Sequence, residues 1–347
     1  MTVLVTGGAG YIGSHALLRL LREGERVVTI DNLLRGHRRP IELLQERFPG
    51  KLTFVEGDIA DEGLVSGVMA AHGVTTVMHF AALTYVGESV EKPLWYWTGN
   101  AAASLALLRV CDRSGVERFI FSSTAATYGQ PGAEHVPIVE TTPQHPINPY
   151  GASKLAFEQM LWDWCRQRAS SGRPVGAAAL RYFNVAGCDR GGLLGEDHDP
   201  ETHLIPVILQ AALGLRERID IFGEDYPTPD GTCIRDYLHV EDLVDAHVRV
   251  MRALQPGETR RYNLAIGRGY SVREVIEACR AVTGREFAVR AGARRAGDPP
   301  VLYADPSLIA NELGWRAEVT DLHAIVESAW RWFLEHPRGY GDSPARA

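Results

Sequence analysis

Short apolar segments rich in β-forming residues alternate with helix-length segments over the first half of the chain. They are TVLVT (2–6), RVVTID (26–31), LTFVEGD (52–58), TVMHFA (76–81), RFIFSS (118–123) and GAAALRYF (176–183). This rhythm predicts a parallel sheet. Because the segments are apolar throughout, helices must cover both faces of that sheet. We therefore predict an α/β fold with a doubly wound, Rossmann-type sheet.

The sequence pattern changes after about residue 184. Gly, Pro and acidic residues dominate 187–202 and 223–232, and the strand-like and helix-like segments that follow do not alternate regularly. We expect one domain at 1–183 and a smaller mixed α/β domain at 184–347. The segment at about 236–254 is a candidate for returning to the first domain, because VEDLVDAHVRVMRAL has the pattern of an amphipathic helix.

Three glycines in TGGAGYIG follow the first predicted strand and precede an apolar helix. Gly7 can take a tight turn, Gly10 lets a diphosphate approach the backbone, and Gly13 lets helix and strand pack closely. The first amides of the helix can then bind the anion. Asp31 ends the second predicted strand, where its carboxylate can accept hydrogen bonds from an adenine ribose. This arrangement predicts dinucleotide binding, with NAD favoured over NADP.

Two neighbouring residues bear on the adenosine end. Arg35 lies close to Asp31 in the sequence and could accommodate a 2′-phosphate, although Asp31 would still repel that group. Asp58 closes the third predicted strand. It is either a second contact to the adenosine or a turn carboxylate.

Tyr150 and Lys154 lie four residues apart in NPYGASKLAFEQML, after an Asn-Pro pair that is typical of a helix start. Both side chains would share one helix face. A phenol needs its pKa lowered by about 3 units, or roughly 4 kcal/mol, to act as a base at neutral pH. A cation about 4 Å away contributes on that order. Thr124 follows the fifth predicted strand and could bridge Tyr150 and a substrate; the alternative is that Tyr150 packs and Lys154 is solvated.

The glycine motif, Thr124 and the Y-x-x-x-K pair resemble those of the extended short-chain dehydrogenase/reductases. More narrowly, DNLLRG, FVEGDI, HFAA followed by VGES, FSSTAATYG, NPYGASK, LRYFNVAG, DGTCIRDYLHV and RRAGDPP are similar, in order, to UDP-glucose 4-epimerases over about residues 1–335. The resemblance implies interconversion of UDP-glucose and UDP-galactose by oxidation at sugar C4, rotation of the 4-keto intermediate and re-reduction on its opposite face. It also implies tightly bound NAD that is regenerated in each cycle.

The same resemblance implies a role for each matching residue. Tyr150 would be the base, Lys154 would bind the nicotinamide ribose and lower the tyrosine pKa, and Thr124 would contact the sugar 4-hydroxyl. The cofactor contacts would be Gly7, Gly10, Tyr11, Ile12, Gly13, Asp31, Asn32, Asp58, Ile59, Phe80, Ala81, Ala82, Asn100, Ser122, Tyr150, Lys154 and Tyr182. The substrate contacts would be Thr124, Tyr150, Asn184, His203, Leu204, Phe222, Arg235, Tyr237, Arg295, Asp298 and Leu302. Guanidinium groups suit the diphosphate.

Departures from related families bear on the reaction and the sugar. Nucleotide-sugar dehydratases resemble one another in an acidic residue just after the position of Thr124, where this chain has Ala125 and Ala126. Elimination of water therefore lacks its acid. A UDP-glucuronate or UDP-N-acetylhexosamine 4-epimerase stays open, and a non-catalytic NAD-binding scaffold would not need the Tyr-Lys-Thr set. By the same resemblance, Leu302 occupies the position that gates the sugar 2-substituent in the family, which implies UDP-glucose and UDP-galactose as substrates with weak activity on N-acetylhexosamines.

A histidine- and acid-rich segment precedes a further helical pattern. It contains Glu196, Asp197, His198, Asp199, Glu201 and His203. We expect no metal here, because Pro200 would interrupt a helix joining the two histidines. The resemblance makes this segment a substrate-covering loop. His203 replaces an amide, and Thr84 replaces a cofactor-contacting lysine, found in some relatives.

Charge and cysteine content limit the partners. The net charge of −7 and pI near 6.0 provide no positive field for nucleic acid or an anionic membrane. The five cysteines include no C-x-x-C pair, and no apolar run approaches the roughly 18 residues of a membrane span. We also expect no secretory leader. These features predict a cytoplasmic protein. The expected partner is a UDP-hexose substrate, and the resemblance implies a homodimer.

Overall fold

A parallel sheet of seven strands forms the centre of the structure, a computed structural model that describes residues 2–295 and 298–341. The strand order is β11-β6-β5-β4-β1-β2-β3, so the order reverses between β4 and β1. The strands are β1 (Thr2–Thr6), β2 (Arg26–Asp31), β3 (Leu52–Glu56), β4 (Thr76–His79), β5 (Arg118–Ser122), β6 (Gly176–Tyr182) and β11 (Thr259–Leu264). In open sheets of this type, ligands bind outside the carboxyl ends of the strands at the reversal.

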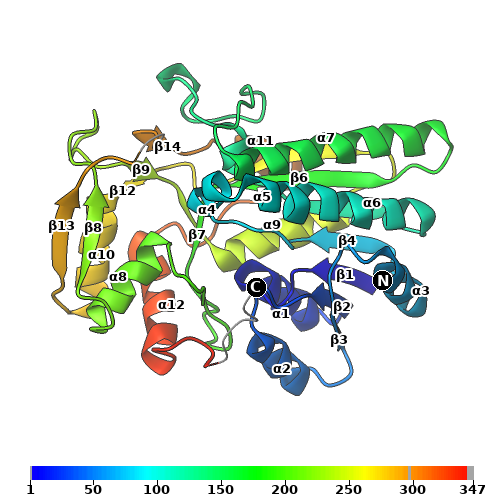
Figure 1. The fold of residues 1–347 in the computed structure, drawn as a ribbon, viewed down its shortest axis with the longest axis horizontal. Coiled ribbons are helices and arrows are strands. Elements are labelled where there is room, and N and C mark those ends of the chain that lie inside the picture. Colours follow the sequence, from blue (N-terminus) through cyan, green and yellow to red (C-terminus); the bar gives the residue numbers. More distant parts are fainter. Residues whose placement is uncertain (1, 296–297, 342–347) are drawn as a thin grey trace.

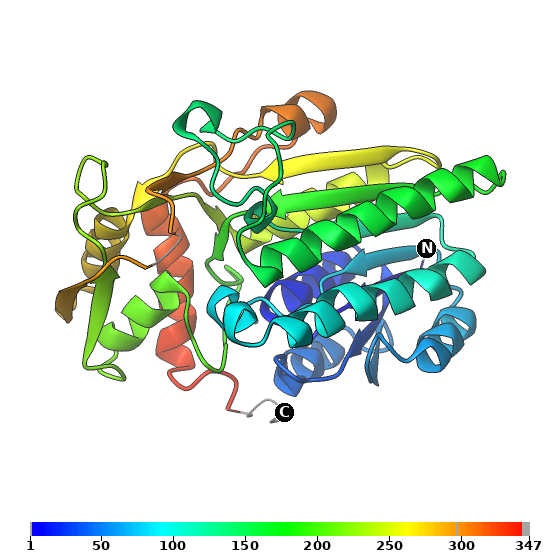
Figure 2. The same ribbon diagram turned by 45° about the horizontal axis from the view of Figure 1, so that its top comes forward.

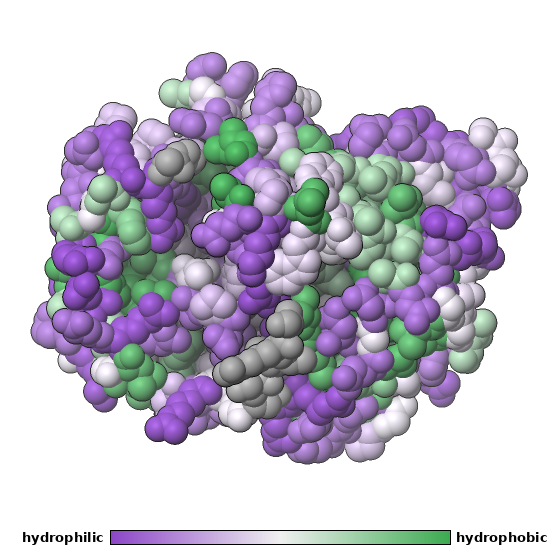
Figure 3. Space-filling model, in the orientation of Figure 1, coloured by the Kyte–Doolittle hydropathy of each residue, from purple (hydrophilic) through white to green (hydrophobic). Residues whose placement is uncertain are grey.

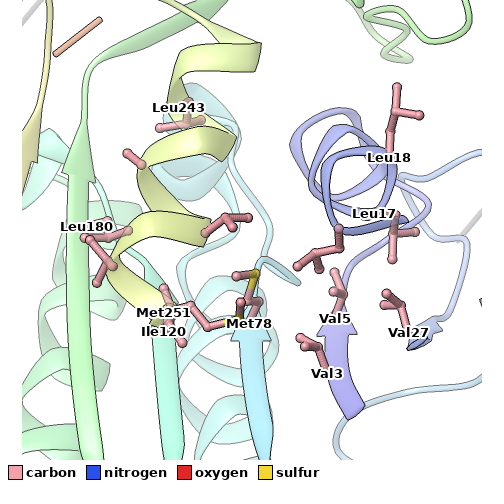
Figure 4. Packing of buried hydrophobic residues seen from close by; sticks show 14 of the residues in the cluster. Val3, Val5, Leu17, Leu18, Val27, Met78, Ile120, Leu180, Leu243 and Met251 are labelled. Carbon is pink, nitrogen blue, oxygen red and sulfur yellow. The ribbon is translucent and has the colours of Figure 1, made fainter. Parts of the chain in front are cut away.

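Helices cover both faces of this sheet, as the uniformly apolar strands predict (Figure 1). One face packs against α1 (Tyr11–Arg22), α2 (Arg38–Arg47), α9 (Val240–Ala253) and α11 (Ser307–Leu313). The other packs against α3 (Glu62–His72), α6 (Ala103–Arg113) and α7 (Pro149–Ser170). Figure 4 shows the first face, where Leu17 of α1 and Met251 of α9 lie against Val5, Met78 and Ile120. The doubly wound Rossmann fold is confirmed.

Four of the expected strands end earlier than predicted. β3 ends before Gly57, whose amide donates to the carbonyl of Asp31. β4 ends before Phe80 and Ala81, because both of their amides donate to the carbonyl oxygen of Thr6 at the end of β1. β5 and β6 each end one residue early. The chain leaves the sheet at these points, which lie at the carboxyl ends of the parallel strands.

The strand β11 was not expected from the sequence. It lies parallel to β6 along the whole length of both registers, from Thr259 opposite Ala177 to Leu264 opposite Tyr182. The helix α9, which precedes β11, packs against α1. Residues 240–264 therefore lie with the first sheet, and the return extends further than the segment 236–254.

The remaining elements form a second apolar cluster beside the carboxyl ends of the sheet (Figures 1 and 2). Its larger elements are α8 (Leu204–Ala212), β8 (Arg218–Phe222), α10 (Val272–Thr283), β13 (Ala288–Gly292) and α12 (Leu322–Glu335). Short strands join the two regions: β7 (Asn184–Ala186) with β10 (Tyr237–His239), and β9 (Ile234–Arg235) with β12 (Tyr270–Ser271) and β14 (Val301–Leu302). β8 pairs with β13 in parallel.

Short helices complete the carboxyl edge. They are α4 (Val86–Glu91), α5 (Pro93–Tyr96), the π-helix η1 (Trp97–Ala102), and the 3₁₀ turns η2 (Ala125–Thr127) and η3 (Ala133–His135). Hydrophilic residues cover most of the face seen in Figure 3, and hydrophobic residues form smaller patches on it. Among the described residues, no helix has the length and apolar character needed to cross a membrane.

Candidate active site

The glycine loop between β1 and α1 has the geometry that an approaching diphosphate requires. Gly7 has φ 75°, and a Cβ there would lie 2.5 Å from the amide nitrogen of Ala81. A Cβ on Gly13 would overlap the Gly7 carbonyl oxygen, so only glycine lets α1 pack this closely. At Gly10, the N-cap of α1, a Cβ would meet only the Gly7 oxygen at 3.5 Å. The backbone at Gly10 is thus open to a ligand, with the first amides of α1 facing it.

Asp31 is held rigidly at the end of β2. Its Oδ2 accepts the Ala9 amide at 2.9 Å and its Oδ1 accepts the Leu33 amide at 2.8 Å. Each carboxylate oxygen keeps a second lone pair for a ribose hydroxyl. Burial raises the pKa of Asp31, and the two amide hydrogen bonds oppose that rise.

The Arg35 side chain is bound to other residues of the protein. Its guanidinium binds both carboxylate oxygens of Glu88 at 2.8 and 2.9 Å, and it also donates to the Asp199 carbonyl at 3.1 Å. A fork paired in this way is not free for a 2′-phosphate. The preference for NAD over NADP therefore rests on Asp31 without opposition from Arg35.

The other predicted cofactor residues lie around the carboxyl edge of the sheet and make different contacts. Asn32 donates to Asp58 Oδ2 at 2.9 Å, which links the ends of β2 and β3. Asn100 is buried, and its amide is occupied by the Leu83 backbone and by Ser153 Oγ. The residues Ile59, Phe80, Ala81 and Ala82 lie in the turns after β3 and β4, Ile12 lies in the first turn of α1, and Tyr11 donates to the Gly187 carbonyl at 2.5 Å.

Tyr150 lies at the start of α7, where Asn148 caps the helix by accepting the Gly151 amide at 2.8 Å. Its ring is almost fully buried against Leu83 and Tyr96. Burial raises the pKa of Tyr150, and a side-chain hydrogen bond with Thr124 lowers it in part. Thr124 follows β5, so the structure brings this pair together as the sequence predicts.

Lys154 is buried one turn after Tyr150 on α7. Its Nζ donates to the Ser122 carbonyl oxygen at 2.7 Å and lies 4.6 Å from the centre of the Phe121 ring. Burial lowers the pKa of Lys154 to about 7, against the attraction of Glu158. The lysine is therefore anchored under the site, and the Tyr150 pKa in this structure is raised rather than lowered. Ser122 Oγ also bonds to the Tyr182 hydroxyl at 2.7 Å.

A buried ion pair between α7 and β6 was not expected from the sequence. Glu158 of α7 accepts two hydrogen bonds from Arg181 of β6, at 2.6 and 3.0 Å, and both side chains are 1% exposed. Ser123 donates to Glu158 at 2.5 Å, and Arg181 also donates to the Tyr128 hydroxyl at 2.9 Å. The network locks α7 onto β5 and β6. A buried glutamate one turn after Lys154 is the only local signal for it.

The predicted substrate residues gather near the junction of the two regions. Arg235 donates to Asp298, and the Arg295 guanidinium lies 3.8 Å from the centre of the Phe222 ring. Leu302 is paired with Arg235 in the β14–β9 register. Tyr237 is buried in β10, Leu204 begins α8, and the Asn184 amide donates to the Asp236 carbonyl at 3.0 Å. Two arginines, an aromatic ring and an aliphatic side chain suit a nucleoside diphosphate.

The acidic segment before α8 is a loop rather than a helix. It brings four of its six candidate side chains into one cluster, formed by Glu196, His198, Glu201 and His203. His203 Nδ1 lies 2.9 Å from Glu201 Oε1, so this nitrogen faces the cluster. The loop itself was expected from the resemblance, but this convergence of side chains was not predicted.

Comparisons with known proteins assign the chain to a family. The model of the NAD dependent epimerase/dehydratase family matches residues 3–265. The chain belongs to this family. UDP-glucose 4-epimerase of Halalkalibacterium halodurans is 47% identical over 98% of this chain and 98% of its own length. Probable UDP-arabinose 4-epimerase 3 of rice is 46% identical over 98% of this chain and 84% of its own length.

Solved structures of the epimerase/dehydratase family agree with the fold. The UDP-glucose 4-epimerase of Stenotrophomonas maltophila, solved with NAD and formylated UDP-arabinopyranose, is 40% identical with a TM-score of 0.91 and covers 97% of this chain and 99% of its own. NAD is accordingly the cofactor of this chain. The open backbone at Gly10 and the fixed carboxylate of Asp31 fit its diphosphate and its adenine ribose.

Proposed function

We propose that the protein interconverts UDP-glucose and UDP-galactose by inverting the sugar at C4, with no net change in redox state. The observation that carries this is the convergence of Tyr150, Thr124 and Lys154 at the carboxyl edge of the NAD-binding sheet. Ala125 and Ala126 follow Thr124 in η2 and offer no proton donor for elimination. Oxidation at a carbinol followed by its reversal is the chemistry that remains.

The side chains divide the work between proton transfer and positioning. NAD, held at the glycine loop and at Asp31, would supply the acceptor for the C4 hydride and the donor for its return to the opposite face. Tyr150 takes the proton of the 4-hydroxyl and later gives it back, and Thr124 holds that hydroxyl towards the phenol. Lys154 is fixed by the Ser122 carbonyl beneath the site, and together with the positive charge of oxidised nicotinamide it offsets the burial that raises the Tyr150 pKa.

Arg235 and Arg295 are proposed to hold the diphosphate, with Asp298 orienting Arg235 through their ion pair. Phe222 and Leu204 would flank the uracil. Leu204 and Phe222 belong to α8 and β8 of the second region, and Tyr150 belongs to α7 of the first, so we expect the sugar to bind between the two regions. Holding the nucleotide while the sugar is free to turn is what inversion at C4 requires.

The test is incubation of the purified protein with UDP-galactose and no added NAD, followed by identification of the product. We expect UDP-glucose, because the cofactor copurifies and is restored in each cycle. The absence of UDP-glucose even with NAD supplied would refute the proposal. NAD retained without any turnover would instead favour a binding scaffold.

A second substrate pair is favoured by the rice relative, whose name refers to UDP-arabinose. A pentose lacks the C6 group and makes smaller demands on the sugar pocket, so we propose UDP-arabinose and UDP-xylose as additional substrates. The same assay run with UDP-arabinose, UDP-glucuronate and UDP-N-acetylgalactosamine ranks the alternatives. A kcat/KM for UDP-arabinose above that for UDP-galactose would make the pentose pair the main substrate.

We also propose a homodimer in the cytoplasm. Large apolar side chains are exposed on successive elements α4, α5, η1 and α6, namely Val90, Leu94, Trp97 and Leu105. Exposed apolar surface of this kind marks protein interfaces. Light scattering after gel filtration should give a molecular mass of twice the chain mass of 38.2 kDa. The Leu94→Glu variant should give a mass closer to that of a single chain. All five cysteines are free and buried, which suits a reducing compartment.

The division into two domains is likewise a proposal. The contacts favour a first domain at 1–183 that also includes the returning residues 240–264, with the substrate-binding domain formed by the rest of 184–347. Limited proteolysis checks it. Cuts confined to the connections between these parts would support the division, whereas early cuts within β11 or α9 would contradict it.

A further inference from the structure

The cluster of Glu196, His198, Glu201 and His203 has the composition and spacing of a transition-metal site. One ligand atom from each residue lies within 4.8 Å of the other three. Glu196 Oε1 is 3.5 Å from His198 Nδ1 and 3.3 Å from His203 Nδ1, and Glu201 Oε2 is 3.2 Å from His198 Nδ1. The edge of a tetrahedron with zinc bonds of about 2.0 Å is about 3.3 Å. The three separations of 3.2, 3.3 and 3.5 Å are close to such an edge.

Glu196 supplies an independent reason to expect a ligand. Its side chain is 2% exposed, and its Oε1 accepts no hydrogen bond from any residue of the described chain. Both neighbouring Nδ1 atoms are close to this oxygen, yet neither is aligned for a hydrogen bond to it. A buried carboxylate oxygen left in this way loses its hydration without compensation. A cation between the four groups would supply the missing partner.

The charges around the cluster point the same way. Glu196 and Glu201 are both buried, and within residues 2–295 and 298–341 their ion-pair partners are His198 and His203. No arginine or lysine of these ranges pairs with either carboxylate. A divalent cation would neutralise two buried carboxylates while both imidazoles stay neutral, which is the protonation state that binds metal.

Glu201 also shows how a ligand would be oriented. Its Oε1 accepts the backbone amides of Thr202 at 2.7 Å and His203 at 2.8 Å. Its Oε2 points instead towards His198. Oε1 also lies 2.9 Å from His203 Nδ1. The two backbone hydrogen bonds fix this carboxylate, as ligating carboxylates are fixed in metal sites.

We propose that these four side chains form a structural zinc site. Two imidazole nitrogens and two carboxylate oxygens in a tetrahedral arrangement suit zinc better than magnesium or calcium, which prefer octahedral or larger oxygen shells. All four protein ligands leave no open position, so the ion is structural rather than catalytic. This proposal is independent of the sugar that the enzyme uses.

The position of the site explains what the ion would do. The His198 ring lies 6.0 Å from the Tyr11 ring at the start of α1, and the Asp199 carbonyl accepts from Arg35. His203 is directly followed by Leu204, the first residue of α8. The zinc would therefore fix the loop 196–203 between the cofactor-binding helix and α8, which carries the proposed uracil contact.

Metal content is the direct test. The full chain with its bound NAD, freed of any affinity tag, is incubated with zinc chloride, gel-filtered and analysed by mass spectrometry for metal. We expect about one zinc per chain. Glu196→Gln, which keeps the side-chain volume, should bind zinc at least tenfold more weakly in a chelator competition. His323→Gln, an exposed histidine beside Asp321 and outside the cluster, is the matched control and should bind as the wild type does.

Two outcomes overturn the proposal: a wild-type chain that retains no zinc after loading, or a Glu196→Gln chain that retains as much as the wild type. Should the variant fail to fold, anomalous scattering at the zinc edge from zinc-soaked wild-type crystals decides. A peak between the four ligands supports the site, and its absence refutes it. The wild-type melting temperature should also fall on addition of a chelator and recover with zinc but not with magnesium.

Discussion

The ammonium of Lys154 is tied to the carbonyl oxygen of Ser122 by a 2.7 Å hydrogen bond. This contact joins α7 to the end of β5. Tyr150 precedes Lys154 by one helical turn, and Thr124 follows Ser122 by two residues, so one bond aligns the phenol with the hydroxyl. Tyr150 and Lys154 are thus held by a regular helix, and Thr124 lies two residues after the end of β5.

Tyr150→Phe should abolish proton transfer while leaving the fold and the cofactor in place. The loss of a general base lowers kcat by roughly 100- to 10,000-fold. The rate of UDP-glucose formation from UDP-galactose measures the effect, and the NAD content of the heat-denatured protein is the control. Full activity in this variant would remove Tyr150 from the mechanism.

Asp31→Asn should weaken NAD binding. The amide can accept from only one of the two backbone amides that Asp31 now binds, and it lacks the charge that attracts the ribose hydroxyls. Hydrogen bonds to a charged group contribute about 1.5–3 kcal/mol, so affinity should fall roughly 10- to 100-fold. Titration of cofactor into stripped protein measures it, with discrimination against NADP expected to shrink. Asp58→Asn is the matched control; an equal loss there would assign the ribose to Asp58 instead.

Breaking the buried pair of Glu158 and Arg181 should destabilise the protein. Both side chains are 1% exposed, so either Glu158→Gln or Arg181→Met leaves an uncompensated buried charge. Such losses cost about 3–5 kcal/mol. Urea unfolding of both single variants and of the double variant gives the coupling energy. Because the double variant buries no lone charge, it should be more stable than the sum of the two losses predicts; strict additivity would contradict the pairing.

The carboxyl of Asp236 should make stability depend on pH. Burial raises its pKa from 3.8 to about 7 in the folded protein. Between these values the folded state binds more protons than the unfolded state, so this group lowers the free energy of unfolding as pH rises from about 4 to about 7. The slope is at most about 1.4 kcal/mol per pH unit.

Asp236→Asn tests that linkage, because an amide oxygen can still accept the Ile266 amide, which now bonds Oδ1 at 3.1 Å. The variant should gain stability relative to the wild type at pH 8 and lose this advantage at pH 4. Denaturant unfolding at several pH values measures the difference. An advantage that is independent of pH would show that Asp236 is already ionised in the folded protein.

Leu302→Tyr should narrow the choice of sugar. Leu302 packs beside the cluster of Tyr128 and Ile138, at the strand that pairs with Arg235. A bulkier ring should lower kcat/KM for UDP-N-acetylgalactosamine by roughly tenfold more than for UDP-galactose. Tyr303→Phe is the neighbouring control and should leave that ratio unchanged. If Tyr303→Phe changed that ratio and Leu302→Tyr did not, Tyr303 would be the residue that discriminates between the sugars.

The sequence predicted those parts of the site whose signals are local. Gly10, Asp31 and the pair of Tyr150 and Lys154 lie at fixed distances from strand ends and helix starts, and the structure places them there. The seventh strand β11 had no such signal, because its neighbour in the sheet is distant in the sequence. The same holds for Arg181, which reads as one polar residue in an apolar strand until Glu158 is seen beside it.

Other features depend on local geometry that the sequence does not show. The segment 196–203 was predicted to be a loop, but the convergence of its two histidines with Glu196 and Glu201 was not predicted. Asn100 was expected at the cofactor, and the hydrogen bonds of its amide with the Leu83 backbone and Ser153 were not predicted. Lys154 was expected to bind the nicotinamide ribose and to lower the Tyr150 pKa; its hydrogen bond to the Ser122 carbonyl was not predicted. Each depends on tertiary contacts that no spacing rule encodes.

The pairing of β11 with β6 has a consequence for how the protein is made. As the chain emerges from the ribosome, β6 appears well before residues 259–264, so its outer edge stays unpaired while everything between them is translated. Unpaired edges recruit other strands. A message truncated between these two strands should therefore give an aggregation-prone fragment, to be cleared by proteases, rather than a smaller working NAD-binding protein.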